Sequence, residues 1–159
     1  LLADEEPSEG LGPFEHAAGG TAFARLGRRA VAQGEGARLL EIAGGDPDAI
    51  DAEVVFAAAA QGDAAARAIL DELLGRLARG IAAAVVVLNP AVLIVGGGVS
   101  RAGTALLEPL ERRIRELVPV PPQVVLSSLG DEAVALGAVR LALQEVEARM
   151  LALDTAEIR

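Results

Sequence analysis

The sequence predicts an α/β fold that is rich in helix and has few strands. Two short apolar runs, at 92–95 and 124–129, have the length and composition of strands. One helical segment separates them, and a strand–helix–strand order favours parallel pairing with a right-handed crossover. Most of the remaining chain of 159 residues carries apolar side chains at helical spacing. With 52% hydrophobic and only 2% aromatic residues, the core of this single domain is expected to be aliphatic.

The first part of the chain predicts a loop followed by two helices. Residues 1–13 combine proline and glycine with several acidic residues, which is typical of a loop or a frayed end. Helical spacing begins at Phe14 and continues to Gln33, and the pair Gly19–Gly20 is a candidate break near its start. A shorter helix over 37–43 ends at the segment GGDPD.

Two aspartates predict the starts of the next two helices. Asp51 is placed to cap a helix that ends at Gln61, and Asp63 is placed to cap the longest helix of the chain. This helix must end at Asn89, because Pro90 lacks an amide hydrogen and excludes the preceding residue from helical geometry. Its last two turns are apolar on all sides, so we expect that end to be buried.

The C-terminal part predicts strand, helix, strand and a final long helix. The uninterrupted apolar run at 92–95 is typical of a central strand that is covered on both faces. A helix follows within 104–118, where Pro109 predicts either a start just before it or a kink. The second strand covers 124–129, and Asp131 is placed to cap the last helix.

Two strands form a small sheet for a chain with this much helix, and a two-stranded sheet has marginal stability on its own. We therefore expect further strands upstream of residue 1. The open strand edge and the apolar strand surface also predict self-association, most simply as a homodimer.

Composition excludes several classes of function. The net charge is −9 and all 14 basic residues are arginine, so this chain lacks the basic surface that nucleic-acid binding needs. It has no cysteine and a single histidine, which excludes disulfides and thiolate metal sites, and we expect no metal site. The acidic start does not resemble a signal peptide, and the long apolar stretch around residues 81–95 is interrupted by Asn89–Pro90. We expect a cytoplasmic protein without a membrane span.

Three consecutive glycines, Gly96, Gly97 and Gly98, follow the first strand in the segment VLIVGGGVSRAG. Ligands of open α/β sheets lie at the carboxyl ends of strands, where these glycines are placed. The established phosphate-binding motifs do not match, because Arg101 stands where a dinucleotide fingerprint needs glycine and the chain has no lysine for a Walker loop. Spacing alone leaves two interpretations open: a ligand-binding loop or a structural turn.

The remaining polar residues give no catalytic set. The single histidine, His16, is not assigned to a serine–histidine–aspartate arrangement, because a lone histidine is more often a packing residue than a ligand. Its neighbour Glu15 suits the first turn of a helix, where a carboxylate interacts favourably with the helix dipole. The charged run at 111–116 is typical of a solvated helix face, and Asp131 with Glu132 fits a helix start. We assign no catalytic residue within this chain.

Several segments together resemble the C-terminal half of the ROK family, which contains repressors and sugar kinases. An alanine-rich helix with QGD precedes the long helix, LNPAVLIVGGGVS follows, and the chain closes with SLGDEAVALGAVRLAL. The resemblance covers about residues 14–146. It implies an actin-like ATPase fold of the ribonuclease H-like type, of which this chain is a helix-rich C-terminal lobe fragment. We divide the chain into a frayed segment (1–13), the C-terminal part of the ROK domain (14–150) and a tail (151–159).

The resemblance also implies two binding sites. Glu15, with His16 beside it, falls where family members place a glutamate that contacts sugar hydroxyls. Gly96, Gly97 and Gly98 match the family loop that lies against the nucleotide. The cysteine-rich zinc loop of the family is absent here, which leaves the shape of the sugar-binding corner open. The catalytic aspartate and the phosphate-binding glycine motif of the kinases are implied to lie upstream.

We expect this chain to be the sugar-sensing and oligomerisation part of a ROK-type transcriptional repressor, which is not catalytic by itself. Its partners are then a sugar or sugar phosphate effector and a second copy, and DNA only through an upstream domain. The alternative is the C-terminal half of a glucokinase-like, ATP-dependent sugar kinase. No cofactor is expected in the repressor, whereas the kinase would bind ATP. A third alternative is a non-catalytic oligomerisation module.

Overall fold

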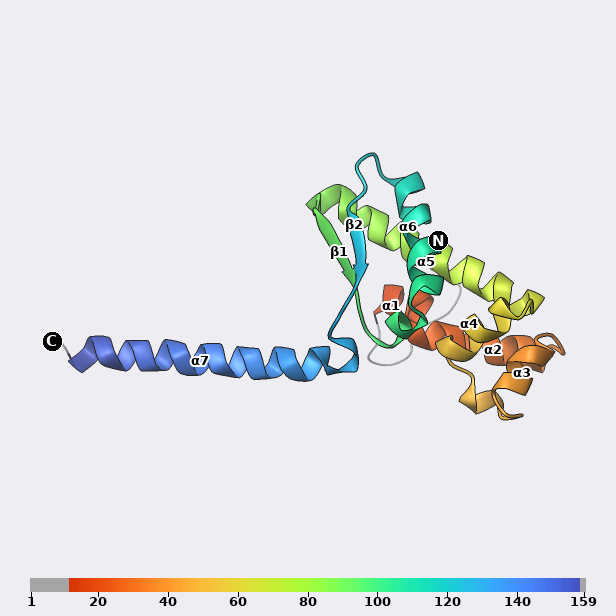
Figure 1. The fold of residues 1–159 in the computed structure, drawn as a ribbon, viewed down its shortest axis with the longest axis horizontal. Helices are drawn as coiled ribbons and strands as arrows, with labels where there is room; N and C mark the ends of the chain where they lie inside the picture. The colour runs from red at the N-terminus through yellow and green to blue at the C-terminus, as the bar shows by residue number, and fades with distance from the viewer. Residues whose placement is uncertain (1–11, 158–159) are drawn as a thin grey trace.

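The computed structural model describes residues 12–157 and consists of helices around one long central helix, with a small sheet at one side (Figure 1). The elements in chain order are α1 (Pro13–Ala18), α2 (Gly20–Ala32), α3 (Ala37–Ile42), η1 (Pro47–Ala49), α4 (Ala52–Ala60), α5 (Ala64–Leu88), β1 (Val92–Val95), η2 (Gly98–Ala102), α6 (Thr104–Leu117), β2 (Gln123–Leu126), η3 (Gly130–Glu132) and α7 (Ala133–Glu157). Most of the loop expected at 1–13 lies outside the described residues, and Pro13 already begins α1.

The predicted caps are confirmed at the two central helices. The Asp51 carboxylate accepts a hydrogen bond of 2.9 Å from the amide of Val54, and α4 begins there. Asp63 caps α5 in the same way, through a 2.9 Å bond from the amide of Ala66. Asn89 ends α5 in the left-handed conformation with φ 44°, a position that asparagine tolerates better than most residues. Local capping rules therefore fix both ends of α5.

The hydrophobic core surrounds α5. Helices α1, α2, α4 and α6 all pack against it (Figure 1). The buried face of α5 combines large and small side chains: Ala66, Ile69, Leu73, Leu74, Ala78, Ala82 and Val85. Phe23 of α2 and Phe56 of α4 form the one aromatic contact of the described residues, with ring centroids 5.8 Å apart. The core is otherwise aliphatic, as the composition predicts.

The sheet has the predicted parallel pairing. β1 pairs with β2, with Val92 opposite Gln123 and Val95 opposite Leu126. The crossover between them is α6, which remains helical across Pro109 rather than starting at it. β2 ends three residues earlier than expected, because the Ser127 side chain accepts a hydrogen bond from the amide of Leu129 and turns the chain.

The start of the last helix also differs from the prediction. Asp131 lies inside the 3-10 turn η3, and α7 begins two residues later, at Ala133. At its other end α7 continues to Glu157, so no helix end marks the expected boundary between residues 150 and 151.

Two surfaces expected to be buried are exposed. On β1, Val92 and Ile94 face solvent while only the opposite face packs on the core, so this strand is covered on one face instead of two. The apolar end of α5 is similarly open, with Val87 81% exposed and Leu88 74% exposed. No element of residues 12–157 packs over these side chains, whereas the sequence pattern alone suggested complete cover.

Helix α7 extends away from the other helices as a single rod (Figure 1). Large apolar side chains described on this helix are exposed: Val134, Leu136, Val139, Leu141, Leu143 and Val146. A run of exposed apolar side chains of this length is unusual for a monomeric soluble protein.

We predict that the isolated chain self-associates through α7. Replacing Val134 and Leu141 with serine should lower the mass found by sedimentation equilibrium toward that of the monomer, because both side chains are mostly exposed and their apolar contacts would be lost. Arg140→Gln, a polar change on the same helix, should leave the mass unchanged. A monomeric wild-type chain at micromolar concentration would contradict the prediction.

Candidate functional site

The glycine segment forms a turn at the carboxyl end of β1. Gly96 lies beside the end of β2, since a Cβ there would be 3.4 Å from Cβ of Ser127. Gly97 has φ 83° and ψ −177°, a backbone conformation that is essentially restricted to glycine. The Ser100 hydroxyl then donates a 2.7 Å hydrogen bond to the carbonyl of Gly97 and closes the 3-10 turn η2.

All three glycines are exposed. A Cβ on Gly97 would have no atom of the described residues within 4 Å, so steric contact within the chain does not require glycine there. Glycine is required there by its positive φ instead. A Cβ on Gly98 would lie 3.5 Å from Nη2 of Arg101. The loop thus presents accessible backbone next to a guanidinium group, which is a combination suited to an anionic ligand.

Glu15 and His16 are both on α1, a helix of only six residues. Glu15 is exposed, and His16 is half-buried. The helix ends immediately after them, where the amide of Gly19 donates a 2.7 Å hydrogen bond to the carbonyl of Glu15. A Cβ on Gly19 would be 3.2 Å from Cγ of Glu15, so this glycine lies directly against the glutamate side chain.

The start of α2 lies next to the glycine segment. Gly20 is the first residue of α2, and a Cβ on it would be 3.4 Å from Cγ2 of Val99, which follows the three glycines. The chain that leaves the helix of Glu15 therefore passes beside the residue that follows Gly96 to Gly98. The sequence placed them about 80 positions apart, and only the fold makes them neighbours.

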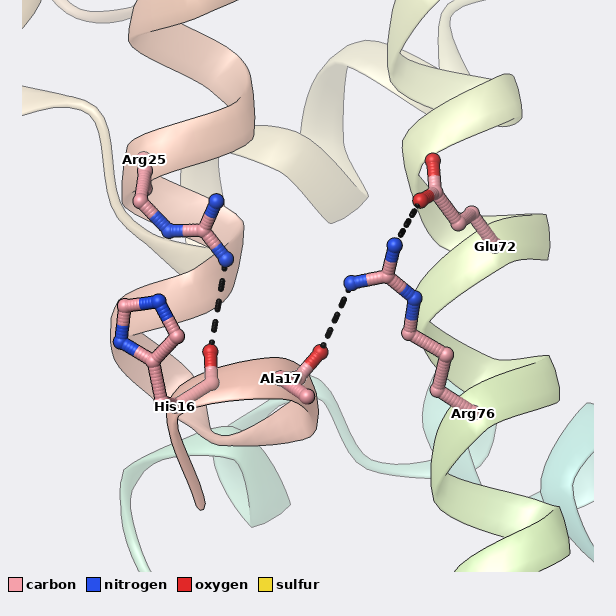
Figure 2. A network of polar contacts seen from close by, with 5 residues as sticks. All are labelled: His16, Ala17, Arg25, Glu72 and Arg76. Carbon is pink, nitrogen blue, oxygen red and sulfur yellow. Dashed lines mark hydrogen bonds and ion pairs between the residues drawn. The ribbon is translucent and has the colours of Figure 1, made fainter. Parts of the chain in front are cut away.

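Two arginines, which the sequence analysis did not identify, hold the end of α1 (Figure 2). Arg25 of α2 donates a 3.4 Å hydrogen bond to the carbonyl of His16. Arg76 of α5 donates a 3.3 Å hydrogen bond to the carbonyl of Ala17 and also pairs with Glu72 one turn earlier. Nothing in the local sequence distinguishes these arginines from those on solvated helix faces, because their acceptors depend on tertiary packing.

Other features of the described residues do not add a second site. A groove of about 370 Å³ lies between α5 and α6 and contains the ion pair of Asp71 with Arg113. It adjoins the C-terminal half of α6, whereas the glycine loop adjoins the N-terminal end. Residues 12–157 contain no cluster of three or more potential metal-ligating side chains. Within the described part of the chain, no helix combines the length and the apolar character needed to span a bilayer.

Comparisons with known proteins agree on one family. The model of the ROK family matches residues 11–145. The chain is 34% identical over 140 residues to the glucokinase of Thermotoga maritima, covering 85% of this chain and 44% of that protein. It is 33% identical to the glucokinase of Streptomyces coelicolor, covering 82% of this chain and 44% of the relative. The chain thus spans less than half the length of these curated relatives.

Solved structures show the same similarity. A crystal structure of a ROK family glucokinase from Streptomyces griseus, in complex with glucose and AMPPNP, superimposes with a TM-score of 0.71 at 33% identity. That alignment covers 82% of this chain and 44% of the other. A putative sugar kinase from Cytophaga hutchinsonii gives a TM-score of 0.52 at 26% identity over 58% of this chain and 32% of its own. The predicted actin-like ATPase fold, represented by a helix-rich C-terminal fragment with few strands, is confirmed.

These relatives correct the predicted function. We expected the sugar-sensing part of a transcriptional repressor, but the relatives reported above are named as glucokinases, a further relative from Brucella melitensis is named as the bifunctional enzyme NanE/NanK, and the superimposed structure is a glucokinase. The absence of the family's cysteine-rich loop is weaker evidence about function than similarity along most of the chain.

We predict that Gly97→Ala destabilises the chain by about 1–3 kcal/mol, because alanine is strained at φ 83° with extended ψ. Urea unfolding followed by circular dichroism measures the change. Gly98→Ala is the matched control: its φ is not positive, and the added methyl group would meet only the mobile end of Arg101. Equal midpoints for the two variants would contradict the prediction.

Proposed function

Because the chain belongs to the ROK family, we propose that it is the C-terminal half of an ATP-dependent sugar kinase. Its function would be to supply one side of the sugar site and one side of the nucleotide site. Support comes from the two separate residue groups that the sequence resemblance assigned to sugar and nucleotide. The start of α2, which follows the helix of Glu15, lies against Val99, which follows the three glycines, and this supports the proposal.

Glu15 is the residue that we propose to bind the sugar. A carboxylate accepts hydrogen bonds from two neighbouring hydroxyl groups, and a buried polar contact of this kind rejects ligands that lack the hydroxyls. The exposure of Glu15 leaves its oxygens accessible to such a ligand. His16 is the second sugar-site candidate, although its half-buried position on the side of α1 that faces Arg25 suits packing as well.

Gly96, Gly97 and Gly98 are the residues that we propose to adjoin ATP. The open space around Gly97 permits a ligand to reach its backbone without a side chain in the way. The Arg101 guanidinium beside Gly98 would favour the negative charge of a nucleotide. ATP would be a substrate of the complete kinase, and we propose no further cofactor and no metal site made by this chain.

The observation that carries the proposal is the contact of Gly20 with Val99. Phosphoryl transfer needs an acceptor hydroxyl close to the nucleotide and depends mostly on positioning and electrostatic stabilisation. A sugar held by Glu15 and a nucleotide held by the glycine loop would approach each other across this contact.

We assign no general base to residues of this chain, and we expect the chain alone to show no sugar-dependent ATP turnover. The base and the remaining phosphate contacts belong to the rest of the proposed kinase. We also propose that the kinase is cytoplasmic and that it forms homo-oligomers. The exposed apolar side chains of β1 and α7 support association with a further surface.

We predict that Glu15→Gln in the complete kinase raises the KM for glucose about 10- to 100-fold, since loss of a charge-assisted hydrogen bond costs about 1.5–3 kcal/mol. The KM for ATP should change by less than about twofold, because the loop that we assign to ATP is intact. A coupled ADP-release assay measures both constants. Glu35→Gln, another exposed carboxylate, is the control. A protein that phosphorylates no sugar, or an unchanged glucose KM for Glu15→Gln, would contradict the proposed site.

A further inference from the structure

Helix α1 needs support from outside itself. With six residues it has little stability of its own, because isolated helices of fewer than about 12–15 residues are marginal in water. Its N-cap, Gly12, provides no side-chain hydrogen bond. The geometry of Glu15 is therefore set by whatever holds α1 against α2 and α5.

The first support is a contact between Phe14 and Gly80. The Phe14 ring lies directly on the backbone of α5 at Gly80, so closely that a Cβ on Gly80 would overlap Cε2, Cζ and Cδ2 of the ring. Phe14 immediately precedes Glu15 in α1, so the position of Phe14 determines the position of the Glu15 backbone. Gly80 is a mid-helix glycine without positive φ, so close approach rather than backbone conformation explains it.

The second support acts at the other end of α1. The last carbonyl groups of a helix lack partners within it, and cationic side chains stabilise them. Arg76 reaches the Ala17 carbonyl from α5, and Arg25 reaches the His16 carbonyl from α2 (Figure 2). Glu72 pairs with Arg76 and orients its guanidinium group. Ala17 and Ala18 are buried beneath these contacts.

We propose that Gly80 and Arg76 are positioning residues for Glu15, an inference that rests on the sugar-binding role proposed above. Gly80 accepts the Phe14 ring at the start of α1, and Arg76 holds its end, so two points on α5 fix the helix that carries the glutamate. Neither residue needs to touch the sugar. Changing either one should weaken sugar binding by moving Glu15, while the glycine loop for the nucleotide remains in place.

The test compares Gly80→Ala and Arg76→Ala with matched controls on the same helix. Gly75→Ala adds the same methyl group where only the end of Arg79 is near, and Arg79→Ala removes the same charge from a side chain that lines the groove between α5 and α6. Amide hydrogen exchange of the chain reports the order of residues 13–20 directly. Kinetics of the complete kinase report the KM for glucose and for ATP.

We expect at least about tenfold faster exchange in α1 for Gly80→Ala and Arg76→Ala, and no change for the two controls. The glucose KM should rise at least fivefold, with the ATP KM and kcat within about twofold, because only ground-state contacts to the sugar are displaced. In a Phe14→Ala background, Gly80→Ala should have no further effect, since the ring that it displaces is absent. Arg76→Lys should restore part of the binding.

Two results would overturn the inference. The first is unchanged exchange in α1 for both variants. The second is faster exchange with an unchanged glucose KM while Glu15→Gln raises that KM. If Glu15→Gln itself has no effect, the proposed sugar site fails instead, and the exchange measurements still decide whether Gly80 and Arg76 hold α1.

Discussion

The structure depends on close packing of several helices against one helix, α5. Alanines recur along its buried face, and Gly80 lies under the ring of Phe14. These small residues allow α1, α2, α4 and α6 to pack closely on α5, because no large side chain holds the helices apart at those positions. Both proposed binding elements are positioned from it: α1 rests on its side, and β1 begins four residues after its end at Leu88. A shift along α5 would therefore move the two sites together.

The same arrangement explains where the chain is incompletely covered. The side of α5 that carries α1, α2, α4 and α6 is buried, while its final turn and the outer face of β1 are not. A parallel sheet normally has both faces covered, and this one has two strands and one covered face within residues 12–157. The curated relatives are more than twice as long as the matched region. Their additional length is consistent with a larger sheet and with more cover than this chain makes for itself.

Local physical rules predicted most elements and few of the contacts between them. The capping aspartates Asp51 and Asp63 and the stop at Asn89–Pro90 act within one helical turn, so their effect was readable from sequence. The burial of β1 and the hydrogen bonds of Arg76 depend on elements distant in sequence, and no spacing rule encodes them. The candidate residues Glu15 and Gly96 to Gly98 came from family resemblance, whereas the geometry that joins them through Gly20 and Val99 required the fold.

The absence of cysteine raised the question of what shapes the proposed sugar-binding corner, and the contacts of α1 provide an answer. A short helix can be fixed by a ring against a glycine at one end and by charge-assisted hydrogen bonds to its carbonyls at the other. Phe14 provides the first, and Arg25 and Arg76 provide the second. These contacts come from two helices that approach α1 from different sides, so they restrict its rotation as well as its position. The corner of this chain can thus hold a carboxylate in a defined place with side chains alone.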